Sequence, residues 1–239
     1  MISFKTGASS SYINGFHNIF GDDYDFINKI IENAGNVFEI YDEGDFCGGL
    51  CVFDISLKVG FEIKSGAYIY GAFISDDKRG RGYFKLLCDH VCDFYQNEFY
   101  DFVLTIPASH TLFSLYEHLG FSDKAYGVIS LLGEDSELSL PEGTIFKDFD
   151  GDFSSLYFMH IENDGIIKIF DLFKSTLEDF EIKYISYNGK DGYALFDNGK
   201  LIFASCDFLT YTKRLKGLIR KLTSFDVPSD FLCDVLFEA

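Results

Sequence analysis

Apolar side chains recur at helical spacing in two segments near the start of the chain, residues 10–20 and 22–33. In the second segment they fall three or four positions apart, at Tyr24, Ile27, Ile30 and Ile31. This spacing places them on one face of a helix. Asp22 or Asp23 can cap the start of that helix. We therefore expect two amphipathic helices at the beginning of the fold.

The next part of the chain consists of β-prone runs separated by turn residues. A turn at 43–45 divides the runs 37–44 and 46–57, which predicts an antiparallel hairpin. Strand and helix patterns then alternate: strand 66–75, helix 83–99, strand 101–106, helix 111–119 and strand 121–132. A strand, helix and strand in this order predict a crossover with 66–75 and 101–106 as parallel neighbours. The pattern indicates an α+β fold with a mixed sheet.

Residues 133–144 are acidic and small and include Pro141 and Gly143, so they mark a candidate boundary. We expect one domain over 1–138 and a smaller α+β domain over 139–239. The predicted elements of the second domain are helices at 153–161, 166–179 and 210–222, three strands within 182–208, and a last strand at 232–239. Asn-Gly pairs at 188–189 and 198–199 are strong hairpin signals between the three strands.

The composition narrows the classes of partner. Of the 239 residues, 20 are Lys or Arg and 38 are Asp or Glu, giving a formal net charge of −18. This balance argues against nucleic acid or an anionic membrane as the main partner, because both attract a positive face. It suits a cationic substrate such as an amine, and it suits plain solubility equally well. We see neither an apolar run of about 20 residues nor a signal peptide, so we expect a cytoplasmic protein. We expect it to be a monomer or a homodimer.

The chain has six cysteines, and we expect them to be free buried thiols. Cys88 and Cys92 share a helix face, but His90 between them points elsewhere. A metal site is therefore not predicted.

The most informative segment is the loop around 79-RGRG-82, which joins strand 66–75 to helix 83–99. Gly80 and Gly82 let the backbone approach a ligand closely. The free N–H groups at the start of the helix form an anion site, to which Arg79 and Arg81 add positive charge. The loop lacks both the P-loop lysine motif and the third glycine of the dinucleotide fingerprint. A glycine-rich turn with solvated arginines is the simpler structural interpretation.

This segment resembles the acetyl-CoA-binding motif of the GCN5-related N-acetyltransferases, [Q/R]-x-x-G-x-[G/A], with Arg79, Gly82 and Phe84 at its three positions. Phe84 departs from the usual small residue. Residues 104–121, LTIPASHTLFSLYEHLGF, resemble the second motif of that family at the expected spacing. The resemblance covers roughly 10–132 and implies an acyl-CoA N-acyltransferase fold, with a central mixed sheet and flanking helices. Residues 140–239 match no acetyltransferase motif; the bacterial two-part members of the family suggest a degenerate half-copy of the fold as one interpretation of 139–239.

The resemblance also implies roles for particular residues. The strand before the loop splays from its neighbour, and the pantetheine of acetyl-CoA lies in the gap against Ala72, Phe73 and Ile74. A backbone N–H near Ala72 polarises the thioester carbonyl. The pyrophosphate is held by the loop residues Arg79, Gly80, Arg81, Gly82, Tyr83 and Phe84. Tyr116 matches the general acid, and the reaction is the direct attack of an amine on acetyl-CoA.

The general base stays open. The position of the family's strand glutamate holds Tyr68, so the candidates are water relayed by Tyr68 or Tyr70, Glu62, or a carboxylate from the second domain. His110 is a further, weaker candidate. A separate question is the basic segment 213–221, which can reach the 3′-phosphate of the CoA nucleotide or can be an ordinary solvated face.

The sequence therefore supports two functions. One is an acetyl-CoA-dependent N-acetyltransferase acting on a small amine, and the other is a non-catalytic module that binds CoA.

Overall fold

The computed structural model describes residues 1–59, 61–130, 140–149, 166–167, 181–204 and 211–227. The chain divides into two compact units. The first comprises Met1–Ser56, Ile63–Asp123 and Gly217–Val227, and the second comprises Leu57–Glu62, Lys124–Lys216 and Pro228–Ala239. This division differs from a single boundary after residue 138, because a segment near the end of the chain returns to the first unit.

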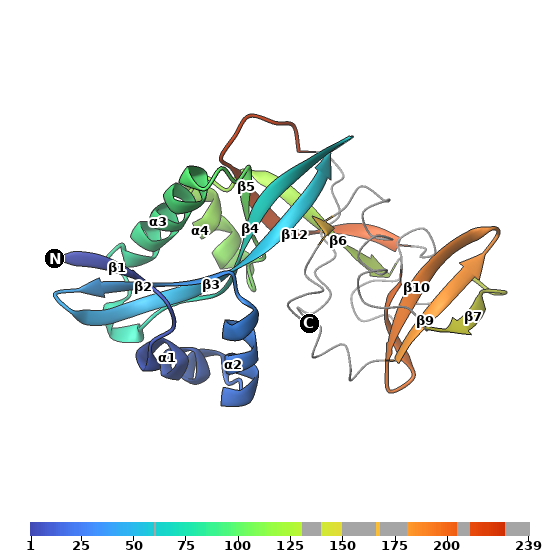
Figure 1. The fold of residues 1–239 in the computed structure, drawn as a ribbon, viewed down its shortest axis with the longest axis horizontal. Coiled ribbons are helices and arrows are strands. Elements are labelled where there is room, and N and C mark those ends of the chain that lie inside the picture. Colours follow the sequence, from blue (N-terminus) through green and yellow to red (C-terminus); the bar gives the residue numbers. More distant parts are fainter. Residues whose placement is uncertain (60, 131–139, 150–165, 168–180, 205–210, 228–239) are drawn as a thin grey trace. The chain divides into compact units, whose positions relative to one another are not determined.

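A mixed sheet forms the centre of the first unit (Figure 1). Its strands lie in the order β1-β2-β3-β4-β5-β12, and β6 follows β12. Their bounds are β1 Ile2–Thr6, β2 Asn36–Asp42, β3 Asp45–Val59, β4 Glu62–Ile74, β5 Phe102–Thr105, β6 Asp123–Ser130 and β12 Tyr211–Lys221. The expected hairpin is confirmed, because β2 and β3 pair antiparallel across a turn in which Glu43 and Gly44 have positive φ.

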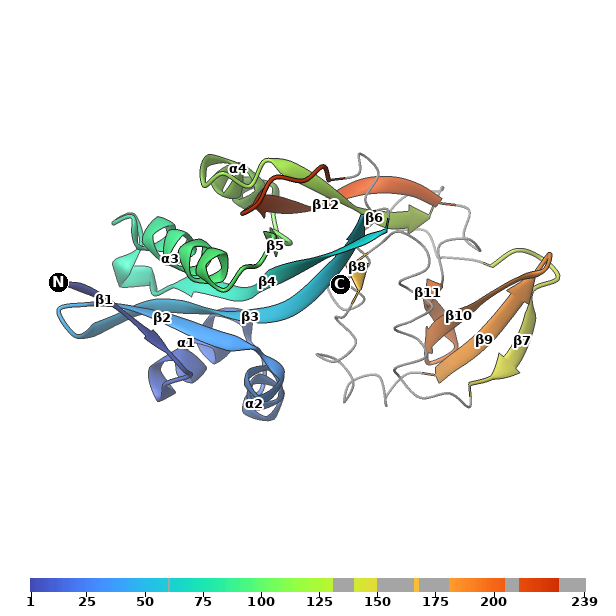
Figure 2. The ribbon, with the colours of Figure 1, turned by 45° about the horizontal axis from the view of Figure 1, so that its top comes forward.

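Helices cover both faces of this sheet (Figure 2). One face carries α1 (Ser10–Phe20) and α2 (Tyr24–Asn33), and the other carries α3 (Tyr83–Asn97) and α4 (His110–His118). A short 3₁₀ turn, η1 (Asp76–Lys78), precedes α3. The predicted N-terminal helices are confirmed, and the carboxylate of Asp23 caps α2 by accepting from the N–H of Phe26. Within the described residues, no helix is long and apolar enough to span a membrane.

The crossover predicted from the sequence is present. Strands β4 and β5 are parallel, with Gly66 opposite Phe102 and Ile69 opposite Thr105, and α3 lies between them in the chain. The apolar stripe of α3 is buried against the sheet at Leu87, Cys88 and Val91. The fold class expected from the pattern, a mixed α/β architecture, is therefore confirmed.

The helix predicted over 210–222 is wrong, because this segment forms strand β12. Residues 218–221 pair antiparallel with β5, where Leu218 faces Thr105 and Arg220 faces Val103. Leu218 and Ile219 are adjacent and both fully buried, as expected in a strand that is covered on both faces. The physical reason is the partner: β5 offers an open edge, and its hydrogen bonds outweigh the local helical pattern.

The second unit contains an antiparallel sheet of order β11-β10-β9-β7. Its strands are β7 Ile145–Asp148, β9 Glu181–Tyr187, β10 Lys190–Asp197 and β11 Lys200–Ala204. Asn188 and Gly189, and likewise Asn198 and Gly199, all have positive φ, as a two-residue type I′ hairpin requires. The predicted meander is confirmed over its described residues.

Several predicted elements of the second domain lie outside the described residues. These are the helix at 153–161, the strand at 232–239 and most of the helix at 166–179. The first two residues of the segment 166–179 are described, and they form a short strand, β8 (Ile166–Ile167), instead of the start of a helix.

Candidate active site

Strand β4 continues beyond its pairing with β5, and the stretch of β4 that β5 does not pair is the centre of the candidate site. Their pairing runs over four residue pairs and ends at Ile69 and Thr105, whereas β4 continues to Ile74. The other end is held closed by Asp101, whose N–H donates to the carbonyl of Ser65 at 2.7 Å and whose carboxylate accepts from the N–H of Ser65 at 3.0 Å. The stretch 72–74 thus lies in the part of β4 that β5 does not pair.

A backbone irregularity at Gly71 determines which way this stretch faces. Gly71 has φ +56°, and a Cβ there would lie 2.2 Å from the ring of Phe16. Ile69, before Gly71, and Ile74, after it, both belong to the core under α3. The two residues are separated by an odd number of positions. Strict alternation would place Ile69 and Ile74 on opposite faces. The shift at Gly71 therefore turns Ala72 and Ile74 towards α3 and α4.

Phe73 faces the opposite side of the sheet. Its ring stacks on Tyr12 of α1 with centroids 5.5 Å apart. A Cβ on Gly15 would lie 2.6 Å from this ring, so α1 lies close to the end of β4 only because position 15 is glycine. The three residues expected along the pantetheine thus lie in the stretch of β4 that β5 does not pair, but their side chains point to two different faces.

The loop between β4 and α3 has the conformation of a backbone anion site. Gly80 and Gly82 have φ +76° and +81°, and a Cβ on either would meet no atom within 4 Å. The glycines are therefore required for their left-handed backbone and not for space. Gly82 is the N-cap of α3 and provides no side chain to accept from the first helical N–H groups. These groups, with the helix dipole behind them, are suited to a phosphate.

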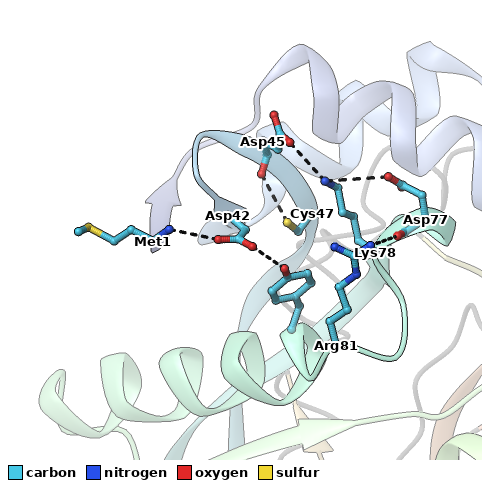
Figure 3. Close-up of polar contacts among 8 residues, drawn as sticks. Met1, Asp42, Asp45, Cys47, Asp77, Lys78 and Arg81 are labelled. Atoms are coloured by element: carbon cyan, nitrogen blue, oxygen red, sulfur yellow. Dashed lines mark hydrogen bonds and ion pairs between the residues drawn. The ribbon is translucent and has the colours of Figure 1, made fainter.

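The cationic side chains of this loop are bound by nearby acceptors. Arg79 donates to the carbonyl of Ile74 at 3.1 Å and forms an ion pair with Asp76 at 2.8 Å, while Arg81 donates to the carbonyl of Asp77 at 3.2 Å. Lys78 lies between the carboxylates of Asp45 and Asp77, at 3.4 and 4.0 Å (Figure 3). These cations stabilise the conformation of the loop through their contacts with carbonyls and carboxylates. The backbone N–H groups are therefore the main groups of the loop that can bind an anion.

The start of α3 is anchored to the β2–β3 hairpin. The hydroxyl of Tyr83, the first residue of α3, donates to Asp42 at 2.7 Å. This hydrogen bond raises the pKa of Tyr83 and lowers the pKa of Asp42. The ring of Tyr83 is buried in the same core as Ile74. The anchor fixes the position of the helix N-terminus relative to the end of β4.

Tyr116, the residue expected to be the general acid, is buried in α4 on the α3 side of the sheet. Its ring contacts Phe84 and Phe121 edge to face, with centroids 5.5 and 5.3 Å apart. It belongs to one core cluster with Ile74 and Tyr83, and Ala72 and Phe84 pack against that cluster. The structure thus places five of the expected site residues in or against one core cluster, and Phe84 and Tyr116 are in direct contact: the five are Ala72, Ile74, Tyr83, Phe84 and Tyr116.

No family model matches the sequence, and no curated protein is similar to it. Solved structures with the same arrangement exist. Eis1 from Mycobacterium abscessus superposes with a TM-score of 0.63 at 9% identity, covering 93% of this chain and 74% of that one. A probable N-acyltransferase from Enterococcus faecalis has a TM-score of 0.63 at 11% identity, with 93% and 73% covered. A GCN5-related N-acetyltransferase from Anabaena variabilis has a TM-score of 0.58 at 18% identity, with 92% and 59% covered.

The chain has the GCN5-related N-acetyltransferase fold. At these identities the likeness establishes the fold and no more, but it covers more than nine tenths of the chain and hence parts of both units. The expected acyltransferase fold is therefore confirmed.

Within the acetyltransferase fold, the candidates for a general base are scattered. Tyr68 is fully buried on the α1 side of β4, and its ring lies 6.2 Å from that of Tyr70, which contacts Phe16 and Phe53. Tyr68 and Tyr70 thus share a face, as alternation predicts, but it is not the face of Tyr116. His110 is exposed at the start of α4, and Glu62 belongs to the second unit.

Two polar residues that shape the site were not identified from the sequence: Asp101 closes the β4–β5 pair, and Asp42 anchors α3. Arg220 belongs to the basic segment 213–221 that was considered for the 3′-phosphate, but its contacts with α3 and α4 were not predicted. None of them is part of a local motif. Asp101 and Arg220 are brought to the site by strand pairing, so only the register of the sheet reveals them.

The four described cysteines are free and buried, as expected. Burial raises the pKa of the Cys51 thiol to about 12 and that of Cys92 to about 11. It also raises the pKa of Cys88. No cluster of three metal-ligating side chains occurs among the residues that the structure describes. The thiols of these cysteines are therefore core groups and not nucleophiles.

Proposed function

We propose that this protein is an N-acetyltransferase that transfers the acetyl group of acetyl-CoA to a primary amine by direct attack. The observation that carries the proposal is the stretch of β4 that β5 does not pair, followed along the chain by the N-terminus of α3. Strand β4 has no β5 partner after Ile69, and Gly80 follows the end of β4 by six positions. The unpaired stretch presents strand backbone, and the start of α3 presents helical N–H groups that no side chain caps.

The residues at this place fit acetyl-CoA. Its pyrophosphate is a multiply charged anion and suits the N–H groups that follow Gly82. Its pantetheine carries two amides, which suit the unpaired edge of β4 at 72–74. When bound, acetyl-CoA supplies an activated thioester. Phe84 does not obstruct the loop, because its ring is directed to Tyr116.

The protein's own groups have separate tasks in this proposal. The N–H near Ala72 donates to the thioester carbonyl and stabilises the charge that develops there. Tyr116 donates a proton to the departing thiolate. The substrate ammonium loses its proton through water near Tyr70, on the other face of the same strand, because the neighbouring Tyr68 is fully buried. The net charge of −18 favours a cationic amine as the acceptor. A cytoplasmic location fits the free thiols of the described cysteines.

A non-catalytic CoA-binding module is the second candidate. It is favoured by one observation: the position of the strand glutamate is occupied by Tyr68, whose side chain is wholly inaccessible to solvent. A protein with an intact phosphate loop and no base near the thioester would bind CoA without turning it over.

A thioester-cleavage assay with an amine panel separates the two candidates. Acetyl-CoA is incubated with the protein and with spermidine, a diamine, an amino acid ester or a neutral amine, and the released thiol and the acetylated amine are quantified together. An acetyltransferase gives stoichiometric thiol and acetyl-amine with at least one amine. CoA binding by calorimetry without any product indicates the binding module, and the absence of both contradicts the proposed function.

A further inference from the structure

Arg220 joins three elements on the α3 side of the sheet. It lies on β12 opposite Val103, and its Nη1 donates to the carboxylate of Asp89 in α3 and to the carbonyl of Leu119, both at 3.0 Å. Leu119 is the C-cap of α4, the helix that carries Tyr116. A single guanidinium thus ties the end of α4 to the middle of α3.

The contact with Leu119 is of the kind that fixes a helix end. The last carbonyls of a helix lack intrahelical partners, and a cation placed there is favoured by the helix dipole. α4 has only nine residues, so its own hydrogen bonds stabilise it weakly. The stem of Arg220 also lies 3.7 Å from the position of a Cβ on Gly120. Arg220 therefore restrains the whole Leu119–Gly120 turn.

This turn is directly connected to Tyr116. The carbonyl of Tyr116 accepts from the N–H of Leu119 at 2.9 Å and from the N–H of Phe121 at 3.1 Å. The rings of Phe121 and Phe84 enclose the phenol from two sides. A shift of the turn would therefore rotate or translate the phenol against Phe84.

The ion pair with Asp89 fixes Arg220 itself. Burial opposes ionisation of Asp89, but hydrogen bonds from Lys85 and Arg220 hold its pKa below the usual value. The side chains of Arg220 and Asp89 are 27% and 31% exposed, so the pair is only partly screened by water. The charge on Asp89 keeps the guanidinium directed at α4.

We propose that Arg220 is a positioning residue that acts through Tyr116, holding α4 so that the phenol stays in place beside Phe84. This inference rests on the proposed function for its catalytic consequence. It makes the end of β12, residues 217–221, a functional part of the first unit. The role is distinct from binding CoA, because none of the contacts of Arg220 described above involves the loop at 79–82.

The test compares Arg220→Met and Arg220→Lys with Lys221→Met. Lys221 is the next residue on β12 and forms its ion pair with Asp123 of β6 at 3.4 Å, so it is a matched control whose ion pair lies outside α3 and α4. Arg220→Met should lower kcat about tenfold, because small misplacement of a reacting group is costly. Arg220→Lys, which keeps the charge, should restore part of this loss. The CoA affinity of the Arg220 variants should stay within about twofold of the wild type. The kcat and the CoA affinity of Lys221→Met should both stay within about twofold of the wild type.

A double variant distinguishes positioning from general destabilisation. In a Tyr116→Phe background, Arg220→Met should cause almost no further loss of kcat, because there is no proton donor left to misplace. An equal loss in both backgrounds, or unchanged kcat, overturns the inference. Hydrogen exchange of the peptide 116–122 is the readout independent of activity, and Arg220→Met should increase it. If the wild type shows no turnover, the proposed function fails, and unchanged exchange would then overturn the role of Arg220 separately.

Discussion

The ring of Phe84 at the start of α3 meets the ring of Tyr116 in α4 edge to face, with centroids 5.5 Å apart and planes inclined by 73°. In the motif that this loop resembles, the position of Phe84 is usually glycine or alanine. The large side chain is accommodated because it turns away from the loop and into the gap between the two helices. It thereby links the phosphate loop to the proposed proton donor.

Replacement of Tyr116 by Phe should keep this aromatic contact and remove only the hydroxyl. We expect CoA binding to be unchanged and kcat to fall. General acids commonly contribute about 10²–10⁴-fold, and a thiolate is a good leaving group, so the loss should be at or below the lower end. Steady-state kinetics with chemistry shown to be rate-limiting provides the measurement. Tyr100→Phe, which removes a hydroxyl bonded to Asp54, is the matched control. Unchanged kcat in Tyr116→Phe would make this residue a core tyrosine.

Replacement of Gly82 by Val should abolish CoA binding while the protein stays folded. At φ +81° a β-branched residue is strained by roughly 1–3 kcal/mol, so the loop should relax and withdraw its N–H groups. Gly199→Val is the control, because Gly199 has the same φ of +81° and lies in a hairpin turn of the second unit. Calorimetric titration with CoA and thermal unfolding should be measured for both. Equal CoA affinity in the two variants would contradict the role of the loop.

Replacement of Gly217 by Ala should destabilise the protein. A Cβ there would lie 2.8 Å from the carbonyl oxygen of Thr105, so β12 could not keep its distance from β5. We expect a loss of about 1–3 kcal/mol in the free energy of unfolding, typical of overpacking. In Gly35→Ala the closest contact is an ordinary 3.4 Å, so denaturant unfolding should change little. Similar stability of both variants would argue against the β5–β12 pairing.

The buried thiols should resist alkylation in the native protein. With a pKa of about 12 for Cys51 and about 11 for Cys92, only a small fraction is thiolate at pH 8, and burial blocks the reagent. These pKa values are raised above the unfolded value of about 8.5, so the folded state favours the protonated thiols. Their contribution to the free energy of unfolding is therefore fully present below pH about 8.5 and is lost as the pH rises towards 11. Iodoacetamide labelling with peptide mass spectrometry should leave both cysteines unmodified at pH 8 until denaturant is added. Rapid native labelling of Cys51 would refute its burial.

Local chemistry in the sequence determined much of the fold. Asp23 caps α2 by a hydrogen bond to a residue three positions away, and the Asn-Gly pairs at 188–189 and 198–199 set their own left-handed turns. The left-handed backbone at Gly80 and Gly82 is likewise a local property of these two residues. These features depend on interactions over a few residues, so they could be predicted without knowing the partners.

The tertiary structure decided what depends on distant partners. The segment 211–221 carries a helical pattern, yet it is a strand because β5 offers it an edge more than 100 residues earlier in the chain. Gly71 shifts the alternation of β4 because Phe16 of α1 occupies the space beside it. Arg220 reaches α3 and α4 only through the register of β12, and Lys78 is held by Asp45 from a different hairpin. A sequence states which residues favour a strand or a helix, but the neighbour that satisfies a backbone hydrogen bond or fills a space is known only when the chain has packed.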